Sequence, residues 1–159
     1  MKRTGIPKGY TLVEVAIVMA LMTITASFAV PAWQNYTINT NLKTAARQLM
    51  ADVVNTSHRA IAENSNIYRI TFNVNNNNYS LSRVDTGVIL WTKSLVSFGG
   101  GNSIQSVNIN GGSIINFQRR GIITPTSGGT IILKNNIDSR ATITVQLTGR
   151  AYVQYNLQK

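Results

Sequence analysis

The feature that most constrains this chain is an uncharged apolar run, Val15 to Trp33, close to its N-terminus. About 20 apolar residues are enough for a helix to cross the hydrocarbon core of a bilayer. The run follows a short segment that contains Lys2, Arg3 and Lys8. Basic residues that flank a span tend to stay in the cytoplasm. We therefore expect one membrane-spanning helix whose N-terminal end faces the cytoplasm.

One ionisable residue, Glu14, directly precedes the apolar run. A charged side chain in hydrocarbon costs about 2.5 to 3.5 kcal/mol at mid-helix, so we expect a partner for this carboxylate. Two simpler interpretations give Glu14 no partner: the segment is a general secretory signal peptide, or it is a plain membrane anchor. The signal peptide is disfavoured because the apolar run does not end in a small-residue cleavage site of the Ala-x-Ala kind. The most similar sequence is Ala26-Ser27-Phe28-Ala29.

The residues around Glu14 read Gly9-Tyr10-Thr11-Leu12-Val13-Glu14. This pattern resembles the type IV prepilin family, in which a basic leader ends in Gly and is followed by an aromatic residue or Met and by Thr-Leu-x-Glu. The resemblance implies that a prepilin peptidase removes a leader of residues 1–9, cutting after Gly9, and that the new amino terminus on Tyr10 is methylated. It also implies that residues 10–36 form a transmembrane and assembly helix, in which Glu14 meets the N-terminal amine of a neighbouring subunit. Pro31 lies where the family commonly has a proline.

After Pro31 the pattern changes to that of an amphipathic helix over residues 37–64. Apolar residues recur at three- and four-residue steps from Leu42 to Ala62, interleaved with polar residues that include Asp52 and His58. Pro31 is expected to bend or loosen the helix because it lacks a backbone donor. Asn64-Ser65-Asn66 should end it, and Arg59 and Glu63 are spaced to pair.

From Ile67 onward alternation replaces the helical period, and turn residues recur every eight to twelve positions. Asn75 to Asn78 predicts the turn of a hairpin, and the runs Gly99–Gly101, Gly111-Gly112 and Gly128-Gly129 predict further hairpin connections. With no helix between the strands, the sheets should be antiparallel. The expected strands are 68–74, 79–84, 88–95, 104–109, 114–118, 130–133, 141–147 and 151–156. The expected fold is α+β: a long N-terminal helix packed on a C-terminal antiparallel β-sheet head, residues 65–159, as in pilins.

The C-terminal half is similar to the GspH/FimT pattern of minor pilins and pseudopilins, through Ile115–Gly121, Gly129–Leu133 and Ile143–Arg150. The resemblance implies a minor subunit of a type IV pilus or type II secretion-type filament, in its tip or initiation complex. It implies three partners: other such subunits through the N-terminal helix, the prepilin peptidase and an inner-membrane assembly platform. It further implies an inner-membrane location with a periplasmic head, or the filament tip after assembly. Phe117, Gly121 and Gly149 are expected to be a core aromatic and two turn glycines.

Catalysis is not expected from this sequence. Cysteine is absent, which removes disulfides and thiolate metal sites, and His58 is the only histidine. The glycine runs are not followed by the helix that a phosphate loop requires. Asp85 and Asp138 lie in turn-like sequences, where local backbone contacts are more usual than acid–base work. We therefore predict no catalytic residues, no metal site, no cofactor and no small-molecule substrate.

The charge leaves a DNA-binding alternative open. The chain carries a net charge of +10, and loss of the three leader cations leaves +7. A basic surface can bind nucleic acid, and the candidate residues are Arg119, Arg120, Arg140, Arg150 and Lys159. The Gly-Arg-x-Arg motif of some DNA-binding relatives reads Gly149-Arg150-Ala151-Tyr152 here, without the second arginine.

A further alternative is a membrane-anchored β domain that binds a ligand, with the side chain of Trp91 near Lys93 as a platform. Core packing is the simpler interpretation for Trp91. For Trp33, an interfacial position at the headgroup level is favoured.

Overall fold

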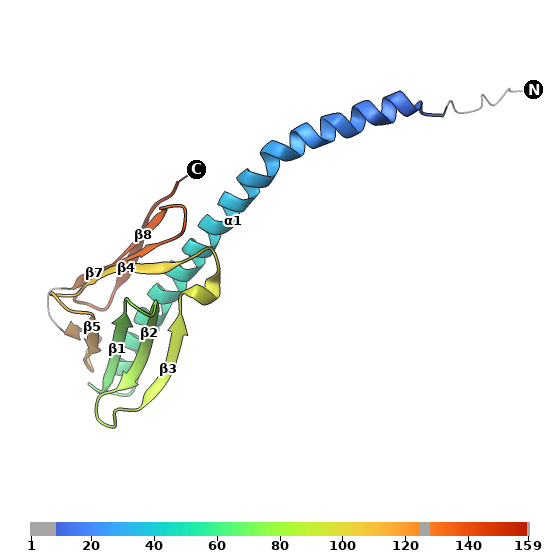
Figure 1. Ribbon diagram of the computed structural model, residues 1–159. Coiled ribbons are helices and arrows are strands. Elements are labelled where there is room, and N and C mark those ends of the chain that lie inside the picture. The colour runs from blue at the N-terminus through green and yellow to red at the C-terminus, as the bar shows by residue number, and fades with distance from the viewer. Residues whose placement is uncertain (1–8, 125–127, 159) are drawn as a thin grey trace, which may run out of the picture. The chain divides into compact units, whose positions relative to one another are not determined.

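The computed structural model describes residues 9–124 and 128–158 (Figure 1). Its contacts divide the chain into two compact units, Met1–Gln34 and Asn35–Lys159, called here the N-terminal unit and the C-terminal unit. The long helix α1 (Leu12–Ala62) contributes its first part to the N-terminal unit and residues 35–62 to the C-terminal unit.

In the N-terminal unit, α1 continues without interruption through Pro31, and every described side chain from residue 9 to 34 is exposed. The hydroxyls of Thr23, Thr25 and Ser27 donate to backbone carbonyls three or four residues earlier, at 2.8 to 3.1 Å. These polar groups are therefore satisfied within the helix, as hydrocarbon surroundings require. By length and composition, α1 is able to cross a membrane.

The helix ends where the sequence predicts, and its last turn explains why. Asn64 has a positive φ of 46°. Its N–H donates to the Ile61 carbonyl, and the Ser65 N–H donates to the Ala60 carbonyl, both at 3.0 Å. This is the Schellman arrangement, which uses a left-handed residue to satisfy the last carbonyls of a helix, and asparagine is one of the few residues that adopt it readily.

Two antiparallel sheets complete the C-terminal unit, and they confirm the predicted α+β class. One sheet has the strand order β3-β2-β1-β5-β6 and the other the order β4-β7-β8-β9. The strands are β1 (Tyr68–Asn73), β2 (Asn78–Arg83), β3 (Ile89–Ser94), β4 (Ser103–Asn108), β5 (Ile114–Phe117), β6 (Ile123–Thr124), β7 (Gly129–Lys134), β8 (Arg140–Val145) and β9 (Ala151–Asn156). A short 3-10 helix, η1 (Val96–Phe98), follows β3. The two-residue strand β6 was not predicted, because two residues carry no readable alternation.

The predicted turn at Asn75 to Asn78 joins β1 to β2, which pair as expected. The hairpin prediction was wrong for the glycine runs between β3 and β4 and between β6 and β7, where the chain passes from one sheet to the other. Between β4 and β5 the chain also changes sheet, but there Asn110-Gly111 form a tight antiparallel turn, in which Ile109 and Gly112 exchange backbone hydrogen bonds at 3.0 and 3.1 Å. At the link between β6 and β7 the backbones approach too closely for a side chain, whereas a Cβ on Gly111, between β4 and β5, would meet open space. A Cβ on Gly129 would lie 2.7 Å from the Asn108 carbonyl oxygen, and one on Gly128 would lie 2.6 Å from that of Val145.

The core lies between residues 42–60 of α1 and the two sheets. Leu42, Leu49 and Val53 from the helix are buried against strand residues such as Ile70 and Ile143. Ile61, grouped with the apolar positions, stays half exposed. Asp52, grouped with the polar positions, is 7% exposed, because the sheet supplies it with polar partners.

Candidate functional site

Glu14, one of the predicted assembly residues, lies in the first turn of α1, where it forms a capping box with Thr11. The Glu14 N–H donates to Thr11 Oγ1 at 3.2 Å, and the Thr11 N–H donates to Glu14 Oε2 at 3.4 Å. This reciprocal pair satisfies backbone donors that would otherwise have no partner in the first turn. Sequence analysis missed this local role of Glu14, although the Thr-x-x-Glu spacing carries the signal.

Gly9 and Tyr10 precede the helix and are exposed, so the predicted cleavage position is outside regular structure. Pro31 lies inside the helix, where it leaves the carbonyl of Ser27 without its usual donor. The roles of Gly9, Tyr10, Glu14 and Pro31 in processing and assembly remain predictions.

Three of the predicted basic residues lie on two neighbouring turns of the C-terminal unit. Arg119 and Arg120 occupy the turn between β5 and β6, and Arg150 follows the turn between β8 and β9. The turns touch: a Cβ on Gly149 would lie 2.5 Å from the Gly121 carbonyl oxygen. Beside them the N–H of Ile123, the first residue of β6, donates to the Leu147 carbonyl at 3.0 Å. None of these three side chains has an ion-pair partner within the described part of the chain.

Arg140 is apart from that group. It begins β8 and pairs with Asn156, whereas the other end of β8, Val145, pairs with Ala151 next to Arg150. The length of β8 therefore separates Arg140 from Arg150. Lys159 lies outside the described residues.

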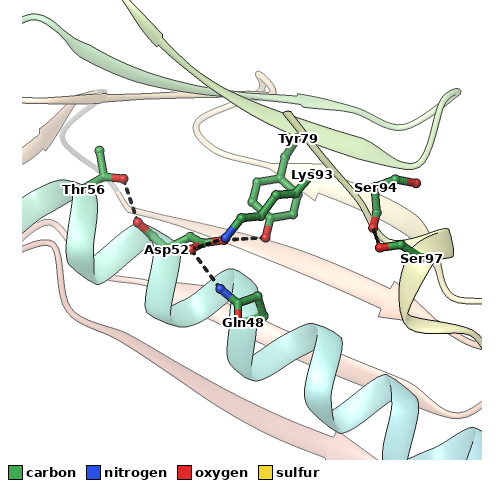
Figure 2. Close-up of polar contacts among 7 residues, drawn as sticks. All are labelled: Gln48, Asp52, Thr56, Tyr79, Lys93, Ser94 and Ser97. Atoms are coloured by element: carbon green, nitrogen blue, oxygen red, sulfur yellow. Dashed lines mark hydrogen bonds and ion pairs between the residues drawn. The ribbon is translucent and has the colours of Figure 1, made fainter. Parts of the chain in front are cut away.

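A polar cluster, centred on the buried carboxylate of Asp52, joins α1 to the edge of the five-stranded sheet (Figure 2). Lys93 Nζ on β3 donates to both Asp52 oxygens at 2.8 Å, and Tyr79 Oη on β2 donates to Oδ2 at 2.7 Å. Gln48 Nε2, one helical turn earlier, donates to Oδ1 at 3.0 Å. Burial and the nearby Asp52 carboxylate raise the pKa of Tyr79 well above its ordinary value. We call these four residues the Asp52 cluster.

The cluster also explains Trp91. Its ring meets Tyr79 edge-on at a centroid distance of 5.7 Å, and Lys93 Nζ lies 4.9 Å from its ring centroid. Trp91 thus packs against the core and against the Asp52 cluster.

The remaining acidic side chains of the C-terminal unit, Glu63, Asp85 and Asp138, form local ion pairs. Arg59 Nε donates to Glu63 at 2.9 Å, as predicted, and Tyr68 Oη also donates to Glu63. The bond from Tyr68, then that from Arg59, lowers the pKa of Glu63. Asp85 accepts the Thr86 N–H as expected, but it also pairs with the Arg83 side chain at 2.9 Å. Asp138 pairs with the Lys134 side chain rather than with backbone. No cluster of three or more metal-ligating side chains occurs among the described residues.

Two glycines in the C-terminal motifs let the turns approach α1. Gly121 and Gly149 have positive φ values of 76° and 73°. A Cβ on Gly149 would lie 2.5 Å from both the Gly121 carbonyl oxygen and Ser57 Oγ, which itself donates to that carbonyl at 3.1 Å. Phe117 is fully buried. The structural interpretation of Phe117, Gly121 and Gly149 is confirmed.

Comparison with known proteins gives one match to a family model and matches to two solved proteins. Residues 7–30 match the family model of the prokaryotic N-terminal methylation motif. The minor pilin FimU of Pseudomonas aeruginosa strain PAO1 superposes with a TM-score of 0.61, at 15% identity, over 75% of this chain and 92% of FimU. The fold is pilin-like. This pilin-like chain is also similar to the minor pseudopilin EpsH of the type 2 secretion system of Vibrio cholerae, with a TM-score of 0.56, at 13% identity, over 72% of this chain and 97% of EpsH. No curated protein sequence is significantly similar to it.

Proposed function

We propose that this pilin-like chain is a minor pilin or pseudopilin subunit of a type IV pilus or type II secretion-type filament, acting in the tip or initiation complex. Before assembly it is held in the inner membrane with its C-terminal unit in the periplasm. The supporting observation is the pairing of the processing pattern Gly9 to Glu14 with an apolar helix whose described side chains, from residue 12 to 34, are all exposed. Such a surface is buried only in lipid or among other helices of the same kind.

The Glu14 carboxylate has different partners in the separate chain and in the proposed filament. In the separate chain its carboxylate accepts the Thr11 N–H, which satisfies it only in part. A carboxylate in an apolar helix bundle is tolerated when an opposite charge is close. The amine of a neighbouring subunit, created by cleavage after Gly9, supplies that charge in the assembled filament.

The first test is processing, in cells that express a prepilin peptidase. Intact-mass spectrometry should show loss of Met1 to Gly9 and the gain of one methyl group. Gly9→Leu should leave the full-length precursor in the membrane fraction. A native protein that keeps its leader, or that is cut beyond Ala29 and released, contradicts the proposal.

The second test is assembly. Glu14→Ala should be cleaved normally but should be depleted from sheared filaments or from pulled-down subunit complexes. Glu63→Ala is the matched control, because it removes an exposed glutamate at the other end of α1. Normal incorporation of Glu14→Ala, or equal loss with both variants, refutes the assembly role of Glu14.

DNA binding is a second candidate, because Arg119, Arg120 and Arg150 gather on two touching turns and have no acidic partner among the described residues. Contacts of these three residues with phosphates of duplex DNA predict a log–log salt slope of about −2 to −3. A gel-shift titration with Arg119→Gln/Arg120→Gln, against the control Arg47→Gln/Arg140→Gln of equal charge, tests the site. A shift that is absent at low salt, or that both variants weaken equally, removes this candidate.

A further inference from the structure

A polar cavity of about 530 Å³ lies beside the turn between β5 and β6. Its polar lining comes from the segment before β1, from β5, from the turn and from β6: Asn66, Asn116, Gln118, Arg119, Arg120 and Thr124. The proposed filament role, which depends on the N-terminal unit, makes no use of this cavity.

The hydrogen bonds around the cavity leave more donors than acceptors free. Gln118 donates its amide to Thr124 Oγ1 at 2.8 Å and keeps a free oxygen, whereas the two lining asparagines keep their NH₂ groups. Asn66 Oδ1 accepts the Arg119 backbone N–H at 2.6 Å, and Asn116 Oδ1 accepts Arg69 Nε at 2.7 Å. A carboxamide has one acceptor oxygen and one NH₂ donor group. With both oxygens engaged by the protein, the free hydrogen-bonding capacity of Asn66 and Asn116 is mainly that of their NH₂ groups.

The cavity is positively charged, which favours the same kind of ligand as its free donors do. Arg119 and Arg120 contribute two guanidinium groups, and no acidic side chain is found among the described lining residues. Guanidinium groups bind carboxylate, phosphate and sulfate through paired N–H donors. A ligand that satisfies this lining must be rich in acceptors and negatively charged.

We infer that this cavity is an oxyanion-binding pocket, which takes a phosphate, sulfate or carboxylate group between Arg119, Arg120 and the amide of Asn66. Metal cations are excluded by the positive lining. Stacking of a nucleobase on Phe117 is excluded too, because that ring is fully buried. The group recognised is therefore the anion itself, whether it is free or part of a polymer backbone.

The test is calorimetric titration of inorganic phosphate into the full chain in detergent, with chloride at matched ionic strength as the blank. Arg119→Gln/Arg120→Gln should weaken binding by about tenfold or more, since charge-assisted contacts are lost. The control Arg47→Gln/Arg140→Gln removes the same charge elsewhere and should bind like the parent chain.

Asn66→Asp is the sharper variant. Aspartate keeps the oxygen that accepts the Arg119 N–H, but replaces the NH₂ donor with a negative oxygen, so binding should be lost while the thermal unfolding midpoint stays close to that of the parent. An absence of saturable phosphate binding overturns the inference. So does equal weakening by the control pair, or undiminished binding by a folded Asn66→Asp variant.

Competition by duplex DNA separates the two sources of the anion. DNA that displaces phosphate identifies the pocket as part of the DNA-binding candidate, while phosphate binding without any DNA shift assigns it to a free oxyanion and ends that candidate. Both outcomes keep the pocket. The measurement uses the unassembled chain, so failure of the filament proposal would leave its result unchanged.

Discussion

Replacing Lys93 by methionine should destabilise the C-terminal unit, because it removes the positive partner of a buried carboxylate. Asp52 is 8% exposed at its side chain and Lys93 is 35% exposed. Methionine keeps most of the apolar stem of Lys93 but lacks the Nζ, which lies 4.9 Å from the Trp91 ring centroid. The substitution therefore tests the charge, with little change in packing volume.

The magnitude follows from the geometry. At the 2.8 Å separation of Lys93 Nζ and Asp52 Oδ2, the Coulomb attraction is about 6 kcal/mol at an effective dielectric constant of about 20. Desolvation of the two ions offsets several kcal/mol of this attraction. Loss of one partner of a fully buried pair costs about 3 to 5 kcal/mol, and the exposure of Lys93 reduces that figure. We expect a loss of about 2 kcal/mol, which lowers the thermal midpoint by about 4 to 8 °C.

Urea unfolding of the detergent-solubilised chain, followed by circular dichroism, measures this loss. The double variant Asp52→Asn/Lys93→Met should recover most of the lost stability, because the neutral amide oxygen can still accept a hydrogen bond from the Tyr79 hydroxyl. The control Lys43→Met removes a lysine from α1 that makes no ion pair among the described residues. The reasoning is refuted if Lys93→Met lies within about 0.5 kcal/mol of the parent chain, or if the double variant is no more stable than the single one.

Three further outcomes are expected. Gly149→Ala should lower the free energy of unfolding in urea by about 2 to 3 kcal/mol, because its Cβ would collide with the Gly121 carbonyl at a positive φ. The control Gly87→Ala, also at positive φ but in open space, should lower it by only about 1 to 2 kcal/mol. Equal losses would rule out the collision. Because the pKa of Tyr79 is raised in the folded chain, stability should be full below the ordinary tyrosine pKa of about 10 and fall as the pH rises above it; Tyr79→Phe should flatten that fall, and an unchanged slope between pH 9 and 11 would contradict the assignment. Because the pKa of Glu63 is lowered, its contribution should be present above about pH 4.3 and disappear as the pH falls; Glu63→Gln should show a weaker decline between pH 5 and 3 than the parent, and an identical decline would show that other carboxylates govern it.

Short-range sequence patterns predict much of the local structure of this protein. The sequence predicts where α1 begins, where its uncharged apolar segment lies, and that it ends just before Asn64. Capping residues, apolar runs and asparagines with positive φ all influence only the backbone within a few residues of them, so their effects can be predicted locally. The alternation of strands such as β7 and β8 is equally local. The Gly9 to Glu14 pattern, although short, was enough to indicate the family of the methylation motif.

Only the tertiary structure could decide which segments meet. Strand length and turn spacing do not say that three glycine runs carry the chain between two sheets, because a glycine turn has the same local geometry whether its strands pair or part. Asp52 is polar in any helical pattern, yet it is buried because Lys93 and Tyr79, far along the chain, supply its partners. Arg150 joins Arg119 while Arg140 stands apart, since that grouping depends on strand register. Sequence determines local conformation through nearest neighbours; burial, charge pairing and the oxyanion pocket arise from contacts between residues distant in the chain.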